Sequence, residues 1–256
     1  MIPELRVEHL TLRFGGLTAL EDVSFTVRPG SLHALIGPNG AGKSSCFNVI
    51  GGLYRATEGR VRLGDTELTG LRPHRMAALG VGRAFQNAAL SPGSSVLDNV
   101  MLGRHALTRG GFLECALRAP WIVRAERRHT RRATEICEFL GIGHLLHTPV
   151  AALPYGQVKR VDIARALAVE PVLLMLDEPA AGMTAAETAD LAETVRAVRD
   201  ELGISILLVE HDMGLVMGIA DRVTVLDFGR RIADGPPDEV QRDPEVVRAY
   251  LGTEAA

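Results

Sequence analysis

Apolar and polar residues alternate along much of the first third of the chain, which is typical of strands with one buried face. The turn signal Arg28-Pro29-Gly30 separates this part from a short apolar run. The predicted strands are residues 6–14, 23–27, 32–36 and 61–63. Residues 45–53 have helical spacing instead, so a helix should follow the third strand. We therefore expect an N-terminal antiparallel β subdomain beside a buried strand, loop and helix.

The middle of the chain, from about residue 88 to residue 153, has a different pattern. Apolar residues recur at helical spacing, for example Ile136, Phe139 and Leu140, and the pattern breaks at Gly141 and Gly143. We interpret this part as an inserted helical subdomain.

The last third returns to strands. Residues 172–176, 204–209 and 223–226 are apolar runs that suit strands buried on both faces. Residues 185–202 form a predicted helix that stops at Gly203. Strand, helix and strand in this order predict a parallel sheet with right-handed crossovers. The expected fold class is therefore α/β, with a mostly parallel sheet.

Composition narrows the class of protein. Apolar residues make up 46% of the 256 residues, aromatic residues 4%, and the net charge is −3, as in an ordinary soluble α/β protein with no nucleic acid partner. Three cysteines without metal spacing suit a reducing compartment. No apolar run approaches the ~20 residues that span a bilayer, so we expect a cytoplasmic protein that reaches any membrane through a partner.

A Gly-rich segment after residues 32–36 fits the pattern G-x-x-x-x-G-K-[ST]. Its glycines let several backbone N–H groups point at one phosphate, and the following helix adds its positive N-terminal end. Lys43 is suited to reach the β- and γ-phosphates, and the Ser44 hydroxyl to bind Mg²⁺. The predicted ATP-binding residues here are Gly37, Pro38, Asn39, Gly40, Ala41, Gly42, Lys43, Ser44 and Ser45.

Two acidic residues, Asp177 and Glu178, follow the apolar run 172–176 and precede Pro179. Ligands of parallel sheets lie at the carboxyl ends of the strands. Asp177 would hold Mg²⁺ through water, and Glu178 would orient or deprotonate the attacking water. A surface turn is the alternative, and the phosphate loop favours the catalytic interpretation.

Three further residues are candidates for the same site. His211 follows the predicted strand 204–209 and would reach the γ-phosphate, although a lone histidine is usually structural. Gln86 lies where the sheet meets the helical insert and would touch Mg²⁺. Phe14, before Gly15-Gly16, would stack on adenine, and a core position suits it equally well.

In chain order, these residues resemble the ABC ATPase family across almost the whole chain. The family signature L-S-G-G-Q reads Leu153-Pro154-Tyr155-Gly156-Gln157 here. The resemblance implies a P-loop NTPase core and a head-to-tail dimer with two ATP molecules at its interface. Each ATP would lie between one subunit's phosphate loop and the signature residues Pro154, Tyr155, Gly156 and Gln157 of the other.

The signature departs from the family form at two positions. Pro154 lacks the serine hydroxyl that the family offers to the γ-phosphate, but proline suits the first turn of a helix. We expect the N–H groups of Tyr155, Gly156 and Gln157 to stay free for the phosphate. Residues 180–183, Ala-Ala-Gly-Met, also depart from the usual S-A-L-D.

A closer resemblance is to the ATPases of branched-chain amino acid importers, and to the larger of their two ATPase subunits. It rests on the Tyr-Gly-Gln signature, on Ala-Ala-Gly after the acidic pair, on the long helical insert and on the C-terminal residues 243–252. It implies a second ATPase subunit, two membrane permease subunits and a periplasmic or extracellular solute-binding protein. The chain would then work peripherally at the cytoplasmic face of the plasma (inner) membrane.

Three alternatives remain open. The solute is another small molecule such as urea or an amide; the chain is a soluble ABC ATPase that acts outside transport; or it binds nucleotide and hydrolyses it poorly. The division that we expect is an ATP-binding core of residues 1–87 and 159–232, a helical subdomain of residues 88–158, and a C-terminal helical tail of residues 233–256.

The insert contains a basic stretch, residues 124–132, interrupted by Glu126 and followed by Glu135. It has the composition of a phospholipid or nucleic-acid patch, but the acidic residues favour an ordinary solvated helix face.

Overall fold

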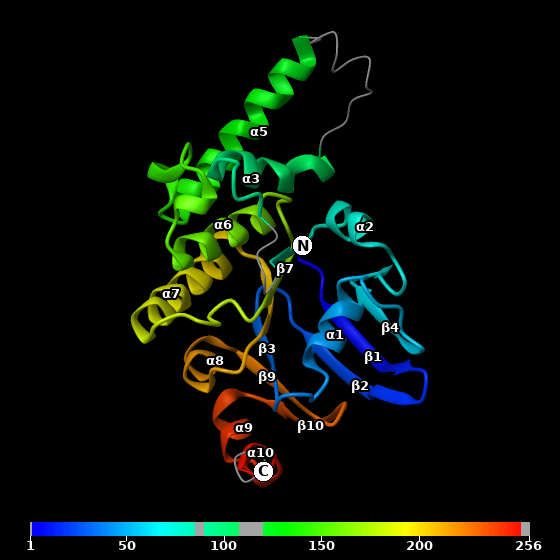
Figure 1. The fold of residues 1–256 in the computed structure, drawn as a ribbon. Helices are drawn as coiled ribbons and strands as arrows, with labels where there is room; N and C mark the ends of the chain where they lie inside the picture. Colours follow the sequence, from blue (N-terminus) through cyan, green and yellow to red (C-terminus); the bar gives the residue numbers. More distant parts are fainter. Residues whose placement is uncertain (1, 85–89, 108–119, 252–256) are drawn as a thin grey trace.

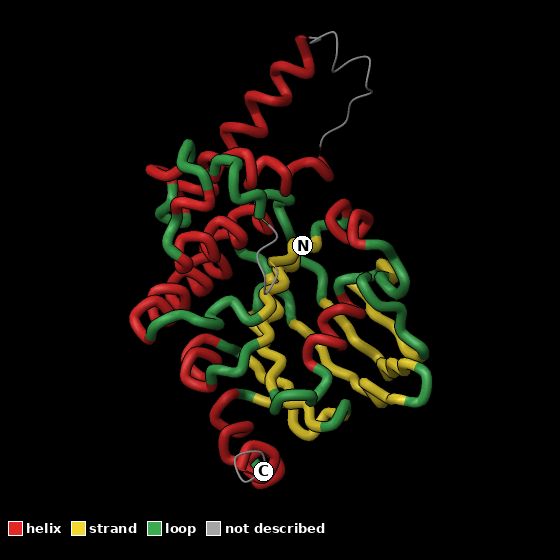
Figure 2. The backbone as a smooth tube through the Cα atoms, viewed as in Figure 1, coloured by secondary structure: helices red, strands yellow, loops and turns green. Residues whose placement is uncertain are grey.

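The computed structural model describes residues 2–84, 90–107 and 120–251 (Figure 1). Two sheets lie side by side, helices cover the larger one, and a group of helices forms one end of the molecule (Figures 1 and 2). Within the described ranges, no helix is both long enough and apolar enough to cross a membrane.

The N-terminal sheet is antiparallel, with the strand order β2-β1-β4-β5. Its strands are β1 (Leu5–Phe14), β2 (Leu17–Val27), β4 (Glu58–Leu63) and β5 (Thr66–Glu67). The predicted antiparallel β subdomain is therefore present, and β2 begins six residues earlier than the alternation had indicated.

The main sheet has the strand order β10-β9-β3-β8-β7-β6 and is parallel except for the pair β9–β10. Its strands are β3 (Leu32–Ile36), β6 (Val81–Ala84), β7 (Leu173–Asp177), β8 (Ser205–Val209), β9 (Arg222–Asp227) and β10 (Arg230–Gly235). This confirms the expected α/β fold with a mostly parallel sheet. Because the first five strands in this list run parallel, their carboxyl ends share one edge.

Most of the helices lie in the connections between strands, while α9 and α10 follow the last strand, β10. The described helices are α1 (Lys43–Ile50), α2 (Pro73–Ala78), α3 (Val96–Gly103), α5 (Pro120–Phe139), α6 (Tyr155–Leu167), α7 (Ala185–Leu202), α8 (Met213–Ile219), α9 (Pro237–Arg242) and α10 (Pro244–Leu251). Three short 3₁₀ turns are η1 (Arg104–Leu107), η2 (Gly143–Leu145) and η3 (Val150–Ala152). The helical subdomain lies at the end of the molecule opposite α9 and α10 (Figure 1).

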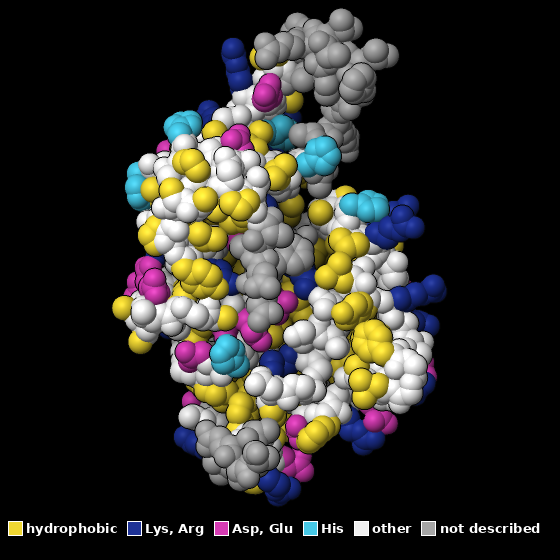
Figure 3. Space-filling view, in the orientation of Figure 1, with side chains coloured by type: hydrophobic (Ala, Val, Ile, Leu, Met, Phe, Trp, Pro, Cys, Tyr) yellow, Lys and Arg dark blue, Asp and Glu magenta, His cyan; other side chains and the backbone are white. Residues whose placement is uncertain are grey.

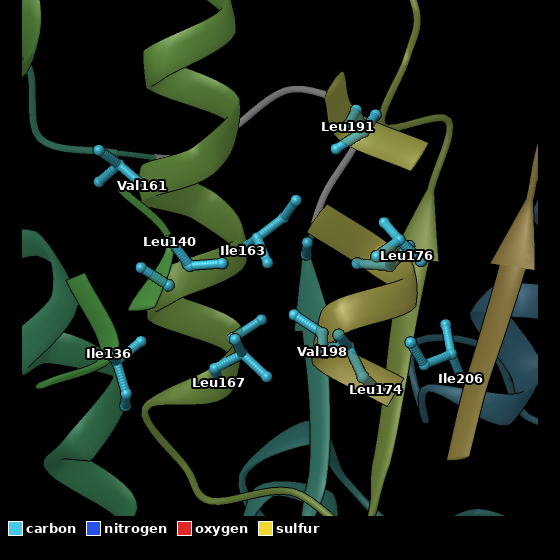
Figure 4. Packing of buried hydrophobic residues seen from close by; sticks show 14 of the residues in the cluster. Ile136, Leu140, Val161, Ile163, Leu167, Leu174, Leu176, Leu191, Val198 and Ile206 are labelled. Atoms are coloured by element: carbon cyan, nitrogen blue, oxygen red, sulfur yellow. The ribbon is translucent and has the colours of Figure 1, made fainter. Parts of the chain in front are cut away.

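Strand β7 shows how the main sheet is buried on both faces. Leu174 and Leu176 pack into an apolar cluster with α6 and α7 (Figure 4). Leu173 and Met175 point the other way, into a second cluster with α1 and the N-terminal sheet. Side chains alternate across a strand, so an uninterrupted apolar run is needed to fill both clusters. The sheet is thereby fixed between two layers, and its edge can position polar groups.

Two expectations need correction. Helix α1 was expected over residues 45–53, but it starts at Lys43 and ends at Ile50, because Gly51 and Gly52 follow and Gly52 has a φ of 76°. Pro154 was expected inside the first helical turn, but it is the N-cap of α6, with an extended ψ of 152°. The carbonyl of Pro154 therefore starts the helix, and its ring lies just outside.

The expected division of the chain changes at its boundaries. The boundary between residues 158 and 159 falls inside α6, and the boundary between 232 and 233 falls inside β10. Since both elements are continuous, we propose to place these boundaries at the start of α6 and at the end of β10. The boundary between residues 87 and 88 lies outside the described residues.

Candidate active site

The phosphate loop connects the carboxyl end of β3 to the start of α1, and two of its glycines cannot be replaced. A Cβ on Gly37, at φ 149°, would lie 2.1 Å from the Leu226 carbonyl oxygen. A Cβ on Gly42, at φ 96°, would lie 2.8 Å from the Ala19 carbonyl oxygen. The loop therefore lies against both β9 and β2, and only glycine fits these two positions.

Lys43 is buried, and its ammonium group lies inside the curl of the loop. Its Nζ donates to the carbonyl oxygens of Gly37 at 2.7 Å and Pro38 at 2.9 Å. Burial lowers the pKa of Lys43, and the nearby carboxylates of Glu178 and Asp177 oppose that effect. A cation is thus held beside the backbone N–H groups of the loop, where a phosphate would gain most from it.

Asp177 is the last residue of β7 and is almost fully buried. Its Oδ2 lies 3.4 Å from Nη2 of Arg83, which also donates to Asn48 Oδ1 at 2.6 Å. The Arg83 guanidinium lies over the Phe47 ring, 4.7 Å from its centroid. Burial raises the pKa of Asp177, while the charge of Arg83 opposes the rise. Arg83 therefore connects β6, α1 and β7 around this carboxylate.

Glu178 has a left-handed backbone, with φ 46°, which is unusual for a residue other than glycine. Its N–H donates to the Val209 carbonyl oxygen at 2.9 Å, which extends the pairing of β7 with β8 by one residue. Glu178 lines the same pocket as the phosphate loop. Strain of this kind persists only where the surroundings impose it, and it is common at functional sites.

His211 follows β8 and is joined to the end of β7 through Glu210. The Glu210 side chain is fully buried and accepts from the Ala180 N–H at 2.8 Å and from the His211 N–H at 3.0 Å. The His211 ring is more than half exposed, with Nδ1 3.6 Å from Glu210 Oε2. The buried carboxylate thus fixes the backbone that carries His211, while the ring remains accessible.

A pocket of about 600 Å³ lies over the phosphate loop. Phe14 stands at its edge, 46% exposed and edge-on to Tyr54 at 5.3 Å between ring centroids. Phe228, in the turn between β9 and β10, is 88% exposed and also lines the pocket. The lining residues are Phe14, Leu17, Thr18, Ala19, Asn39, Gly40, Ala41, Gly42, Lys43, Ser44, Ser45, Glu178, Phe228 and Gly229.

The signature residues lie elsewhere on the same chain. Pro154, Gly156 and Gln157 line a separate pocket of about 300 Å³ with residues of α7. The Tyr155 ring is half exposed, and a Cβ on Gly182 would lie 3.6 Å from it. One earlier expectation is wrong: the Gln157 N–H is not free, because it donates to the Pro154 carbonyl oxygen at 3.0 Å. Those of Tyr155 and Gly156 have no acceptor recorded among the described residues.

The structure therefore gathers the phosphate loop, Phe14 and Glu178 around one pocket, with Asp177 and His211 on the adjoining strand ends. Gln86 lies outside the described residues. Sequence reasoning did not single out Arg83, Glu210 or Phe228. Glu210 had a local signal, because it is an acidic residue directly after a buried strand. Arg83 had none, because its role depends on its contact with Asp177, 94 residues away in the sequence.

Two family models match the chain. The one described as "ABC transporter" matches residues 20–181, and the one described as "Branched-chain amino acid ATP-binding cassette transporter" matches residues 230–256. Together with a P-loop nucleotide site at the edge of a parallel sheet, these two matches define the class of this protein as an ATP-binding ATPase. The chain belongs to the ABC transporter family, as the resemblance of its motifs had predicted.

Individual relatives agree with this family. The chain is 40% identical to the "High-affinity branched-chain amino acid transport ATP-binding protein LivG" of Salmonella typhimurium, over 98% of both chains. It is 39% identical to the BraF protein of the same description in Pseudomonas aeruginosa, again over 98% of both chains. Among solved structures, the ADP conformation of the cassette MJ1267 has a TM-score of 0.85 and 33% identity, covering 98% of this chain and all of that one.

Proposed function

We propose that this chain hydrolyses ATP to power the import of branched-chain amino acids through a membrane permease. The observation that carries the proposal is the convergence of Lys43, Asp177 and Glu178 at one edge of the main sheet. The cargo is supported by the names of relatives that are similar over almost their whole length and by the family model matching residues 230–256.

In this proposal each residue has one role. The loop N–H groups and Lys43 bind the phosphates, and Phe14 stacks on the adenine. Glu178 orients or deprotonates the attacking water, and His211 keeps the γ-phosphate and that water in register. The left-handed backbone of Glu178 and its place in the lining of this pocket support its role.

Mg²⁺ fits the residues beside the loop. It prefers oxygen ligands, and Ser44 and Asp177 supply a hydroxyl and a carboxylate. The Asp177 carboxylate is buried with a raised pKa, so a divalent cation beside it would favour its charged form. We propose that Ser44 and Asp177 hold the ion, which neutralises phosphate charge when bound. Gln86 stays a predicted third ligand.

The second half of each ATP site comes from another ATPase subunit in this proposal. The signature residues line a pocket apart from the phosphate loop, so one chain carries two separate surfaces. A head-to-tail dimer brings one subunit's signature pocket to the partner's loop. The backbone N–H groups of Tyr155 and Gly156 at the start of α6 would then face a phosphate.

This chain has a groove of about 660 Å³, mostly apolar, between α2, α3 and α6. It is a candidate docking site for the permease. Leu53 and Leu102 line it and are 50% and 60% exposed. We propose that a segment of the permease fills this groove, since a transport ATPase must contact a membrane-spanning partner and exposed apolar surface of this kind suits a protein contact. The chain then lies peripherally at the cytoplasmic face of the plasma membrane, with a solute-binding protein on the opposite side.

The test is ATP hydrolysis by the chain reconstituted in vesicles with its candidate permease and second ATPase subunit. Solute-binding protein loaded with leucine should stimulate hydrolysis, and Leu102→Glu should abolish that stimulation while leaving nucleotide binding intact. If urea or an amide stimulates ATP hydrolysis and leucine does not, that solute would replace branched-chain amino acids as the proposed cargo. Hydrolysis that is vigorous and indifferent to any permease would overturn a role in transport.

A further inference from the structure

Helix α5 carries a line of exposed residues on the side that faces away from the molecule. Trp121, Arg124, Arg128 and Arg131 follow one another at intervals of three, four and three residues, which places them on one helix face. Trp121 is 64% exposed, and the other three side chains are also exposed. The opposite face packs into the helical subdomain through His129, Ala133, Ile136 and Cys137. We call the four exposed residues the Trp–Arg stripe.

Within the part of the chain that the structure describes, most of the arginines in the N-terminal half of α5 have no ion-pair partner. Arg124, Arg127 and Arg128 have no ion pair recorded among the described residues, whereas Arg131 and Arg132 pair with Glu135 at 3.0 and 3.1 Å. Glu126 comes five residues after Trp121, so it points to another side of the helix. The N-terminal half of the helix therefore offers guanidinium groups and one aromatic ring to a partner outside the chain.

The position of α5 indicates which partner it can reach. The helix projects beyond the rest of the described molecule at the end where α3 lies, with α2 to the side of it (Figure 1), and a basic side chain stands out on the surface there (Figure 3). The same two helices line the apolar groove described above. If the permease occupies the groove, the membrane lies beyond this end, on the side toward which α5 extends.

We propose that the Trp–Arg stripe rests on the anionic lipid surface of the membrane beside the permease. This inference rests on the proposed function, because it takes the direction of the membrane from the docking groove. Guanidinium groups bind lipid phosphates, and indole rings favour the interface between headgroups and acyl chains. A single exposed tryptophan next to arginines fits a lipid surface better than a nucleic acid, given the chain's net charge of −3. The stripe would orient the ATPase under its permease.

Trp121 allows a direct measurement, because it is the single tryptophan of the chain. The full chain is titrated with vesicles of phosphatidylcholine, with or without phosphatidylglycerol, while tryptophan emission is recorded. We expect a blue shift with the anionic vesicles only, weakened by salt, and quenching by brominated acyl chains. The triple variant Arg124→Glu/Arg128→Glu/Arg131→Glu, which replaces every arginine of the stripe, should weaken binding by roughly 100-fold or more.

The matched control is Arg60→Glu/Arg242→Glu/Arg248→Glu, which makes the same change in net charge at exposed positions away from α5 and should bind like the original chain. ATP hydrolysis, measured in the same preparations, separates this proposal from the proposed function, since neither variant touches the nucleotide site. If the α5 variant proves unfolded, Arg124→Gln/Arg128→Gln replaces it. Equal binding to neutral vesicles, unaltered binding by the α5 variant, or a shift with duplex DNA in place of vesicles would each overturn the proposal.

Discussion

At the scale of single residues, the geometry around Glu178 decides what the site can do. Glu178 has a left-handed backbone and lines the pocket over the phosphate loop, while Asp177 stays buried beside Arg83. The two neighbouring acids thus have different surroundings, which suits one to hold a cation and the other to act on water.

Replacing Glu178 with glutamine should separate binding from hydrolysis. The amide keeps the shape of the side chain but cannot accept a proton, so we expect ATP hydrolysis to fall roughly 100-fold or more. Nucleotide affinity should stay within a few-fold of the original value. Phosphate release and equilibrium nucleotide binding measure the two effects, with Glu193→Gln, on the exposed side of α7, as the control. An unchanged rate in Glu178→Gln would remove Glu178 from the mechanism.

The two exposed aromatic rings at the pocket predict base recognition. Phe14→Ala and Phe228→Ala should each weaken ATP binding. The loss should be roughly 5- to 100-fold for whichever ring stacks on the base. Binding of inorganic triphosphate, which has no base, should be unaffected. Calorimetry with both ligands checks this. If a variant loses triphosphate binding as well, that ring supports the loop rather than the base.

At the scale of elements, the start of α6 lacks the side-chain cap that α3, α7 and α8 have. Pro154 is its N-cap and offers no hydrogen bond, whereas Thr184 and Ser95 form full capping boxes on α7 and α3. Pro154→Ser should therefore add about 1 kcal/mol of stability. It should also raise the hydrolysis rate of the assembled complex roughly tenfold, because the new hydroxyl can reach the partner's phosphate.

Pro154→Ala separates these two effects, because it changes the ring without adding a hydroxyl. Thermal unfolding and steady-state hydrolysis are measured on both variants. A rate that stays the same in Pro154→Ser would mean that the backbone N–H groups of α6 already supply all the stabilisation that this surface offers.

The pairing of β3 with β9 contains a buried histidine that predicts how stability depends on pH. His33 shares a hydrogen bond of 2.8 Å with Thr224 Oγ1, and burial lowers its pKa to about 4, from 6.5. Between these values the unfolded chain binds a proton that the folded chain does not, so stability falls as pH falls from about 6.5 to about 4. The loss attributable to this group is on the order of 3 kcal/mol.

The variant His33→Gln retains a donor near Thr224 but cannot titrate, so its unfolding free energy should fall less over this pH range. Denaturant unfolding of both proteins across the range isolates the contribution of His33 from that of the carboxylates. Parallel curves for the two proteins would contradict it.

How far the sequence predicts the fold depends on how local each signal is. The phosphate loop and the acidic pair are encoded in short segments next to buried strands, so their placement followed from spacing. Strand β10 was not predicted, because Arg230, Arg231 and Asp234 break the alternation of apolar and polar residues. It forms a strand through its antiparallel pairing with β9. The contact between Arg83 and Asp177, and the fixing of His211 by Glu210, depend on strand neighbours that no local pattern specifies.

At the scale of the whole molecule, the proposed head-to-tail dimer would give the chain two halves of different ATP sites. The pocket over the phosphate loop is open on one side, and the signature pocket lies apart from it. Hydrolysis should therefore depend on association between subunits, whether the partner is a second copy or the second ATPase of the importer. Nucleotide binding to the loop should need only one chain.

A dilution series tests this dependence. Specific hydrolysis activity of the isolated chain should rise with protein concentration, or on addition of its second ATPase subunit, because only dimers turn over. Nucleotide affinity per chain, measured under the same conditions, should change far less.

Gly156→Asp serves as the matched variant. It places a carboxylate at the start of α6, where the carboxylate would repel a phosphate bound to the partner subunit but would not contact the phosphate loop of its own chain. It should bind ATP normally and fail to hydrolyse it. Specific activity that is constant on dilution and survives Gly156→Asp would mean that one chain completes its own site.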